Sequence, residues 1–380
     1  MLPKRCPFSG RGAGKAVCTM KVNEIKKVEV GYLNTPLEYM PNLTKEIGKG
    51  KLYIKRDDMT GLAFGGNKAR KLDYLVQDAI EDGCNALMTF GGVQTNHGRM
   101  TVAAAVKYGM KPILVLTGPK PDYCSGNLIL DRMMGADIHF IDTSAYADLP
   151  EPEKSEKTAA FLAQETEKLV AEYEKQGIHP YNVPVGGSSL VGAAGYINAI
   201  PEIMQQMKDQ GIKAKYLVCG YGSMGTFGGL WAGAKYYNAP FEVIGVPVSP
   251  TFRGPEQIAG FIGKLSDEYE LDITCSPEEI HLATGSKESP YYGVGYNIPD
   301  PVTQEYMALL ARTEGIFTDP CYSGKIFRGF VDLVKSGVIP EGENAIFLHS
   351  GGTPAIWSKE HLDAAQEMFY DGEGLFVHKA

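Results

Sequence analysis

Short apolar runs alternate along the chain with longer segments of helical pattern. The runs predict seven strands, near residues 52–56, 86–90, 113–116, 138–141, 215–219, 242–246 and 345–348. Helices are expected between them, among them a charged surface helix with spaced alanine and leucine residues over 151–175. Strands that alternate with helices are typical of an α/β fold with parallel sheets.

Four polar residues stand at the first of two glycine-rich junctions between a strand and a helix: Gln94, Thr95, Asn96 and His97. Thr95 or Asn96 is expected to cap the helix over 100–108, because a short polar side chain there accepts a hydrogen bond from a free backbone amide. A cap needs only one residue. Consecutive polar groups at the carboxyl end of a strand are typical of a ligand-binding position in an open α/β sheet.

The second junction is the loop GYGSMGT, residues 220–226, before a helix over 227–236. Its unpaired backbone amides and the positive end of the helix dipole suit a phosphate group, and Ser223 and Thr226 add hydroxyl donors. The glycines also match the dinucleotide pattern G-x-G-x-x-G, so a nicotinamide-dependent oxidoreductase is the competing interpretation. Glu242 is the only candidate for its ribose carboxylate, and a monophosphate loop is favoured.

Lys68 directly follows two glycines and Asn67, in a segment where a regular strand or helix is hard to keep. A lysine that only solubilises a surface gains nothing from such neighbours. A lysine that forms an imine with a bound aldehyde does, because its amine must reach the cofactor through a bend without side-chain bulk. A simple turn is the alternative interpretation.

Five motifs stand along the chain in the order KRDDMTGLAFGGNKARK, FGGVQTNH, GSMGT, EGIFTDPCYSGK and HSGGTPA. With these motifs the chain, over about residues 33–369, resembles the family that contains 1-aminocyclopropane-1-carboxylate (ACC) deaminase and D-cysteine desulfhydrase. The resemblance implies a fold-type II pyridoxal-phosphate enzyme, similar to the tryptophan synthase β chain, with two three-layer α/β domains and the cofactor between them.

The resemblance also implies the domain boundaries. Residues 1–65 and 190–380 are expected to form the large cofactor-binding domain, and residues 66–189 a smaller inserted α/β domain. The GGSS segment at 186–189 would serve as the hinge. Residues 1–22, which are basic and rich in glycine, are expected to form a flexible extension.

Transferred position by position, the resemblance implies that Lys68 carries the cofactor as an imine and that Asn96 binds its ring hydroxyl. Thr95 stands where the family usually has serine, next to the substrate carboxylate, and its extra methyl group narrows the pocket. Lys71 belongs to the same motif as Lys68, but a solvated helix face explains it equally well. The phosphate is expected on the backbone of Gly222, Ser223, Met224, Gly225 and Thr226.

Two positions separate the activities within the family. ACC deaminases resemble one another in having glutamate where this chain has Ser323 and leucine where it has Ser350. D-cysteine desulfhydrases are similar to this chain at the first position and have a small hydroxyl residue, typically threonine, at the second. His97 also matches the desulfhydrases, since the deaminases tend to have glutamine there.

The physical chemistry of these positions favours elimination over ring opening. A glutamate against the pyridine nitrogen would keep it protonated and make the ring a strong electron sink, as opening a cyclopropane requires. A serine leaves a weaker sink, which suffices to expel a thiolate. Ser323 and Ser350 are therefore counted among the cofactor-binding residues, although both could also be small residues in a crowded interior.

The implied function is that of D-cysteine desulfhydrase, a carbon–sulfur lyase that converts D-cysteine to pyruvate, hydrogen sulfide and ammonia by α,β-elimination. Lys68, displaced from the cofactor by the substrate amine, would take the α-proton. Thr95 and Tyr322 are the further catalytic candidates, and Tyr296 and His97 are expected near the substrate. ACC deaminase and L-cysteate sulfo-lyase are the alternatives, and a cofactor-bound regulatory protein is the non-enzymatic one.

Composition limits the classes of partner that the protein is expected to bind. The chain has 380 residues, ample for two domains, and a net charge of −8 without a basic cluster, which argues against nucleic acid and acidic membranes. No apolar run approaches the roughly 18 residues of a membrane span. A small amino acid is the expected partner, and the resemblance implies a homodimer.

The seven cysteines are scattered, odd in number and without a C-x-x-C pair. This pattern indicates a reducing, cytoplasmic environment and argues against structural zinc, so no metal is expected.

Overall fold

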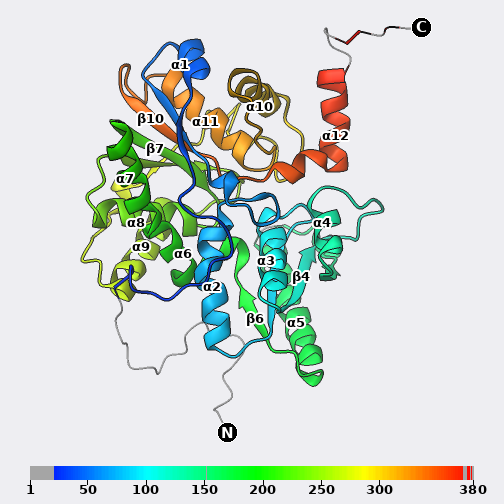
Figure 1. The fold of residues 1–380 in the computed structure, drawn as a ribbon. Helices are drawn as coiled ribbons and strands as arrows, with labels where there is room; N and C mark the ends of the chain where they lie inside the picture. Colours follow the sequence, from blue (N-terminus) through cyan, green and yellow to red (C-terminus); the bar gives the residue numbers. More distant parts are fainter. Residues whose placement is uncertain (1–20, 151, 371–374, 377, 379–380) are drawn as a thin grey trace.

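Two open sheets form the framework of the molecule (Figure 1). The computed structural model describes residues 21–150, 152–370, 375–376 and 378. The larger sheet lies at the upper left of Figure 1 and the smaller one at the lower right. Helices cover the faces of both sheets, and the fold is α/β, as the sequence predicts.

The larger sheet has six strands in the order β1-β2-β10-β7-β8-β9, all parallel except β1 against β2. In the central strand β7, Leu217 and Val218 are fully buried in two different cores, one on each face of the sheet. The strands are β1 (Leu37–Tyr39), β2 (Leu52–Lys55), β7 (Ala214–Tyr221), β8 (Glu242–Pro247), β9 (His281–Leu282) and β10 (Asn344–Leu348).

The smaller sheet is fully parallel, in the order β5-β4-β3-β6. Its neighbouring residues Leu87 and Met88 also enter cores on opposite faces. All its strands fall inside the insert predicted at 66–189, although the domain boundaries themselves stay a prediction. The strands are β3 (Ala86–Gly91), β4 (Lys111–Thr117), β5 (Asp137–Ile141) and β6 (Pro180–Val183).

Helices complete a three-layer arrangement around each sheet. In Figure 1, α6 to α9 lie below the larger sheet, and α1, α10 and α11 lie above it. The helices are α1 (Pro41–Ile47), α2 (Lys68–Glu81), α3 (Asn96–Lys107), α4 (Asn127–Met133), α5 (Glu153–Lys175), α6 (Leu190–Ile197), α7 (Ala199–Gln210), α8 (Gly225–Tyr236), α9 (Pro255–Tyr269), α10 (Pro301–Glu314), α11 (Ser323–Lys335) and α12 (Lys359–Ala365).

Each sheet together with the helices that cover it is called a unit below. Helix α2 joins the two units by packing on α6. A side chain at Gly195 of α6 would place its Cβ 2.1 Å from the backbone oxygen of Arg70, so only glycine permits this approach. The crossing fixes α2, and with it Lys68, relative to the larger sheet.

The seven predicted strands and the helix at 151–175 are confirmed, with small shifts at their ends. Strands β1 and β9 were not predicted, because three and two residues are too few for a pattern. Strand β6 was not predicted either, because its sequence PYNV contains a proline and an asparagine, which are rare in strands. The expectation that a helix is hard to keep at Lys68 is wrong. The bend precedes the helix, where Ala63, Phe64, Gly65 and Gly66 have φ of 43°, 69°, 69° and 138°, and α2 begins directly at Lys68.

The predicted flexible extension falls mostly on residues 1–20, which lie outside the described residues. At its far end the prediction is wrong. Val22 is 1% exposed and belongs to the core beneath α6 and α7. Its carbonyl oxygen accepts a hydrogen bond of 2.8 Å from the side chain of Asn198, so the chain is already anchored there.

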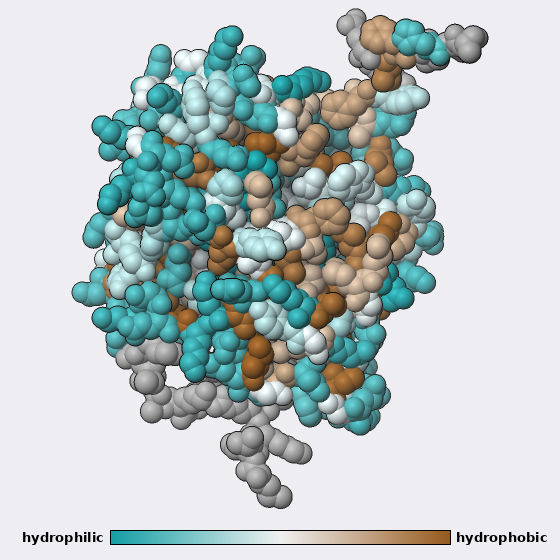
Figure 2. Space-filling view, viewed as in Figure 1, coloured by the Kyte–Doolittle hydropathy of each residue, from teal (hydrophilic) through white to brown (hydrophobic). Residues whose placement is uncertain are grey.

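In the described part of the chain, no helix combines the length and apolarity that a membrane crossing needs. Polar side chains cover most of the left of the face shown in Figure 2, whereas apolar ones gather toward its centre and right.

Candidate active site

A cavity of about 570 Å³, of the size that small ligands occupy, lies between the two units and is called the Lys68 cavity below. Gly91 and Thr95 line it from the β3–α3 junction, and Gly222, Tyr296 and Ser350 line it from the larger unit. Segments far apart in the sequence therefore share one wall.

The cavity brings most of the predicted site residues together. Its lining includes Lys68, Thr95, Asn96, His97, Gly222, Ser223, Met224, Thr226, Tyr296, Tyr322 and Ser350. Gly225 and Ser323 are not part of the lining. Gly225 starts helix α8 directly behind the loop, and Ser323 is fully buried at the start of α11.

Lys68 is the first residue of α2, and its Nζ donates a hydrogen bond of 2.8 Å to Oδ1 of Asn67. Burial lowers the pKa of the Lys68 amine to about 8, while Asp319 acts in the opposite direction and Arg99 adds to the lowering. A lysine with such a pKa holds a useful fraction of neutral amine near neutral pH. That is the form which attacks an aldehyde.

The glycine loop leads directly into the amino end of α8. Met224 takes a left-handed conformation with φ of 62°, which turns the chain into the helix. Ser188 accepts a hydrogen bond of 2.9 Å from the backbone amide of Gly225, and Asn67 donates one of 3.2 Å to Oγ1 of Thr226. The helix N-terminus and the nearby hydroxyl groups suit a phosphate.

The interpretation of Lys71 as part of a solvated helix face is wrong. The residue is 1% exposed, and its Nζ donates a hydrogen bond of 3.0 Å to the carbonyl oxygen of Gly186. A Cβ added to Gly225 would lie 3.1 Å from this Nζ, so the ammonium group stands against the phosphate-type loop. Burial and the neighbouring Lys68 lower the pKa of Lys71 well below its ordinary value. A bound phosphate would offset the cost of burying the protonated form of Lys71.

At the start of α3, the expectation of a helix cap is confirmed. Thr95 is the N-cap, and its hydroxyl accepts a hydrogen bond of 3.1 Å from the amide of Gly98. The Asn96 side chain accepts a hydrogen bond of 2.9 Å from Asn127 and donates one of 3.3 Å to Oδ2 of Asp319. Asn96 is therefore held from both ends of its amide.

Asp319 is the main residue that the sequence reasoning missed. It is fully buried, and its carboxylate accepts hydrogen bonds from the backbone amides of Cys321, Tyr322 and Ser323 at the start of α11. The Ser323 hydroxyl lies 2.6 Å from Asp319 Oδ1 and 2.9 Å from the carbonyl oxygen of Gly351. The only signal in the sequence was an acid inside the DPCYSGK motif.

The two tyrosines of the cavity form an edge-to-face pair with ring centroids 5.8 Å apart. Burial raises the pKa of both Tyr296 and Tyr322, so both keep their hydroxyl protons near neutral pH. Tyr322 can therefore donate a proton there but is not poised to accept one. Arg253, which also lines the cavity, was not among the predicted residues.

The dinucleotide interpretation is wrong, because the one candidate for its ribose carboxylate lies at the opposite end of the parallel strands from the glycine loop. Glu242 opens strand β8, whereas the glycine loop follows the end of the parallel strand β7. Its side chain is 61% exposed and lies 3.3 Å from His281.

The residues present fit pyridoxal phosphate. The Lys68 amine can hold its aldehyde, Asn96 can reach its ring hydroxyl, and the loop before α8, with Lys71 behind it, can bind its phosphate. Two observations carry the fit: the lowered pKa of Lys68 and the buried amino group of Lys71 against the loop.

Comparisons with known proteins agree with this fit. A family model described as pyridoxal-phosphate dependent enzyme matches residues 28–351. D-cysteine desulfhydrase of Salmonella typhi is 35% identical over 331 residues, which cover 85% of this chain and 93% of that protein. 1-Aminocyclopropane-1-carboxylate deaminase of Bradyrhizobium sp. strain ORS 278 is 34% identical over 349 residues, 89% and 97% of the two chains.

Among solved structures, an ACC deaminase homologue superimposes with a TM-score of 0.75 at 31% identity, covering 92% of this chain and 98% of that one. Fold, cavity and sequence thus agree, and the chain belongs to the pyridoxal-phosphate dependent enzyme family, in the group that holds the ACC deaminases and D-cysteine desulfhydrases.

Proposed function

We propose that this pyridoxal-phosphate dependent lyase is a D-cysteine desulfhydrase, which eliminates hydrogen sulfide from D-cysteine and releases pyruvate and ammonia. The alternatives are ACC deamination and the elimination of sulfite from L-cysteate. Relatives of similar identity are named D-cysteine desulfhydrase and ACC deaminase. The choice among the three activities must therefore rest on the residues of this cavity.

One observation supports elimination most strongly. Among the described residues, those that line the Lys68 cavity include two basic side chains, Lys68 and Arg253, and no carboxylate. Bound pyridoxal phosphate withdraws electrons from the substrate Cα, most strongly when its ring nitrogen is held protonated by a carboxylate. Opening the ring of ACC breaks a carbon–carbon bond that has no good leaving group, so it needs the protonated, strongly electron-withdrawing cofactor. Expelling a thiolate does not.

The residues of the cavity have defined tasks in this proposal. The Thr95 hydroxyl and the free amides at the start of α3 bind the substrate carboxylate. The neutral amine of Lys68 takes the proton from Cα, and the Cβ–S bond breaks with its electron pair on sulfur. Tyr322 holds a phenolic proton that it can donate to the departing group. The released 2-aminoacrylate hydrolyses to pyruvate and ammonia in water.

A substrate panel tests the proposal directly. The purified holoenzyme is incubated with D-cysteine, L-cysteine, ACC and L-cysteate, and sulfide, sulfite, pyruvate and 2-oxobutyrate are measured. Sulfide and pyruvate from D-cysteine should dominate. If 2-oxobutyrate from ACC is the main product, the enzyme is a deaminase and the proposal fails.

The covalent role of Lys68 is tested separately from the substrate. Borohydride reduction followed by peptide mapping should fix the cofactor on Lys68. The variant Lys68→Ala should retain its fold and bind the cofactor only without a covalent bond. Fixation on any other side chain would contradict the assignment.

A homodimer and a cytoplasmic location complete the proposal. The family resemblance supports the first, and the scattered cysteines support the second. Light scattering of the holoenzyme should give the mass of two chains, and a monomer would contradict this part alone.

A further inference from the structure

Asn67 is the N-cap residue of α2, directly before Lys68. Asparagine is a preferred N-cap residue, because its side-chain oxygen accepts a hydrogen bond from a free amide of the first helical turn. The Asn67 side chain makes no such bond. It is 7% exposed, lines the Lys68 cavity and binds two other groups of the site instead. The start of α2 thus gives up a stabilising cap, and the amide is free for another task.

The two ends of the Asn67 amide bind Lys68 and the glycine loop. Its Oδ1 accepts a hydrogen bond of 2.8 Å from Nζ of Lys68, and its Nδ2 donates one of 3.2 Å to Oγ1 of Thr226. A protonated Lys68 can only donate, so the amide oxygen must face it and the amide nitrogen must face Thr226. The backbone amide of Asn67 donates a further bond of 3.0 Å to the carbonyl oxygen of Ser350, which holds the residue in place.

The Lys68 amine depends on this contact for its position. Among the described residues, Asn67 is the one partner that hydrogen-bonds it. The other ionisable groups whose charges interact with the amine, without a hydrogen bond to it, are Asp319, Arg99, Lys71 and His97. A lysine side chain has many rotamers, so an amine that nothing holds spends little time at the atom with which it must react.

An acceptor beside the amine also suits its chemistry. A neutral amine can donate an N–H to Oδ1 of Asn67 and keep its lone pair free to attack an aldehyde or to take a proton. A donor at this place would occupy the lone pair. A carboxylate would favour the charged ammonium, which has no lone pair. An uncharged amide oxygen avoids both effects.

We propose that Asn67 is a positioning residue, which holds the Lys68 amine beside the glycine loop and leaves its lone pair free. This inference rests on the proposed function, in which Lys68 first holds the cofactor and then takes the substrate proton, and it deepens that function. Thr226 fixes the other end of the amide. The loop that would receive the phosphate and the amine that would receive the aldehyde are therefore kept in a fixed relation.

The variant Asn67→Asp tests the proposal through the pH at which the apoenzyme captures pyridoxal phosphate. The substitution keeps the size of the side chain but places a negative charge against Nζ of Lys68, which favours the ammonium. In stopped-flow absorbance, the midpoint of the capture profile should move up by about one pH unit or more from the wild-type Lys68 pKa of about 8. A midpoint that stays in place would overturn the proposal, because a carboxylate in contact with the amine must raise its pKa.

Asn182→Asp is the matched control. Asn182 is an exposed asparagine of β6, so this variant changes the net charge of the protein by the same amount as Asn67→Asp. Its midpoint should equal that of the wild type. A shift as large as that of Asn67→Asp would show that net charge, and not contact with the amine, moves the midpoint, and the proposal would fail.

Asn67→Ala gives a second measurement and serves if Asn67→Asp does not fold. It removes the acceptor without adding a charge. Well above the midpoint, where the amine is neutral, capture should be slower than in the wild type by about fivefold or more, the worth of one hydrogen bond. The rates are normalised to the amount of cofactor bound after long incubation, so that only folded protein is compared. An unchanged rate would contradict the positioning role.

These measurements use the cofactor and no substrate, so they are independent of the proposed function. If D-cysteine yields no sulfide but Asn67→Asp shifts the midpoint, the proposed function fails and the role of Asn67 stands. If sulfide forms and the midpoint does not move, the proposed function stands and the role of Asn67 is excluded.

Discussion

The carboxylate of Asp319 accepts a hydrogen bond of 3.3 Å from the side-chain amide of Asn96, a residue 223 positions earlier in the chain. The same carboxylate caps the start of α11, where Tyr322 lies. One buried side chain thus links the group expected at the cofactor ring to the candidate proton donor. Gly352 completes the junction, because an added Cβ would lie 2.6 Å from the Asn96 amide nitrogen.

Asp319→Asn should weaken this junction. The substitution keeps the shape but replaces one acceptor oxygen with an amide donor, which would then face the donors of α11 or of Asn96. Loss of one hydrogen bond to a buried charge should lower the free energy of unfolding by about 2–3 kcal/mol. The measurement is urea unfolding followed by circular dichroism.

The exposed residue Asp363 of α12 provides the control. Asp363→Asn should stay within about 0.5 kcal/mol of the wild type. If the two variants behave alike, Asp319 is not a positioning residue.

Lys71→Met should weaken cofactor binding without harming the fold. Removing one charged hydrogen bond to the phosphate should raise the dissociation constant of pyridoxal phosphate by about 10- to 100-fold. The fold should persist, because methionine fills a similar buried volume, although the hydrogen bond to the Gly186 carbonyl is lost. Equilibrium dialysis measures the affinity, and Lys264→Met, at an exposed position of α9, is the matched control. Equal affinity of the Lys71 variant and the control would exclude a role in phosphate binding.

Most of the framework could be predicted from the sequence, because it depends on local pattern. Strands buried on both faces are nearly continuous apolar runs, and β3, β4, β7 and β10 read that way. The glycine loops stand out for the same reason, since a tight turn before a helix needs Gly or a polar cap. Strands as short as β9 carry too few residues for a pattern.

The parts of the site that could not be predicted depend on contacts between distant segments. Lys71 is separated by 115 positions from the carbonyl oxygen that it binds, and nothing in its own helix distinguishes it from a surface lysine. The orientation of Ser323 toward Asp319 rather than into the cavity depends on the turn before α11. The surroundings of the buried His97 ring depend on Thr89, which in turn donates a hydrogen bond to Val183 of the neighbouring strand.

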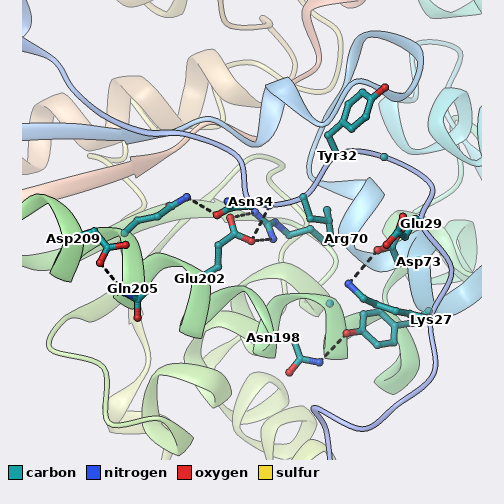
Figure 3. A pocket seen from close by; sticks show the side chains of 15 residues that line it. Lys27, Glu29, Tyr32, Asn34, Arg70, Asp73, Asn198, Glu202, Gln205 and Asp209 are labelled. Atoms are coloured by element: carbon teal, nitrogen blue, oxygen red, sulfur yellow. Dashed lines mark hydrogen bonds and ion pairs between the residues drawn. The ribbon is translucent and has the colours of Figure 1, made fainter.

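Arg70→Met should unfold the protein at lower denaturant concentration. Arg70 is 2% exposed and pairs with Asp57 at 2.9 Å and Glu202 at 2.8 Å, in the charged wall of a second hollow between α2 and α7 (Figure 3). Asp57 is fully buried, so the substitution leaves a carboxylate that has lost its strongest cationic partner, with Lys55 still nearby. Breaking such a pair typically costs about 3–5 kcal/mol.

The pH dependence of this cluster follows from Asp57. Burial alone would raise the pKa of Asp57, but Arg70 and Lys55 outweigh it and lower the pKa to about 2. The pair therefore stabilises the fold above the ordinary aspartate pKa, and this stabilisation is lost as the pH falls through 2. The double variant Arg70→Met, Asp57→Asn should be less destabilised than the two single effects added together. Strict additivity would show that the two residues do not interact.

The pH at which the apoenzyme captures its cofactor should follow Lys68. Only the neutral amine attacks the aldehyde, and burial lowers the pKa of Lys68 to about 8. The rate of capture should rise with pH and level off above this value, whereas an ordinary lysine would still gain rate up to its pKa near ~10.4. Stopped-flow absorbance with pyridoxal phosphate measures the profile, and Lys68→Ala should show no covalent phase.

The stability of the apoenzyme has a matching dependence with a definite sign. Between about pH 8 and the ordinary lysine pKa, the unfolded chain keeps the Lys68 proton while the folded chain releases it, so the stability contributed at this site rises with pH. Lys68→Met removes that linkage. The variant should be more stable than the wild type at pH 7, and the difference should shrink steadily up to pH ~10.4. A difference that stays constant across this range would mean that the Lys68 amine is as well solvated in the fold as in the unfolded chain, and that the protein does not lower its pKa.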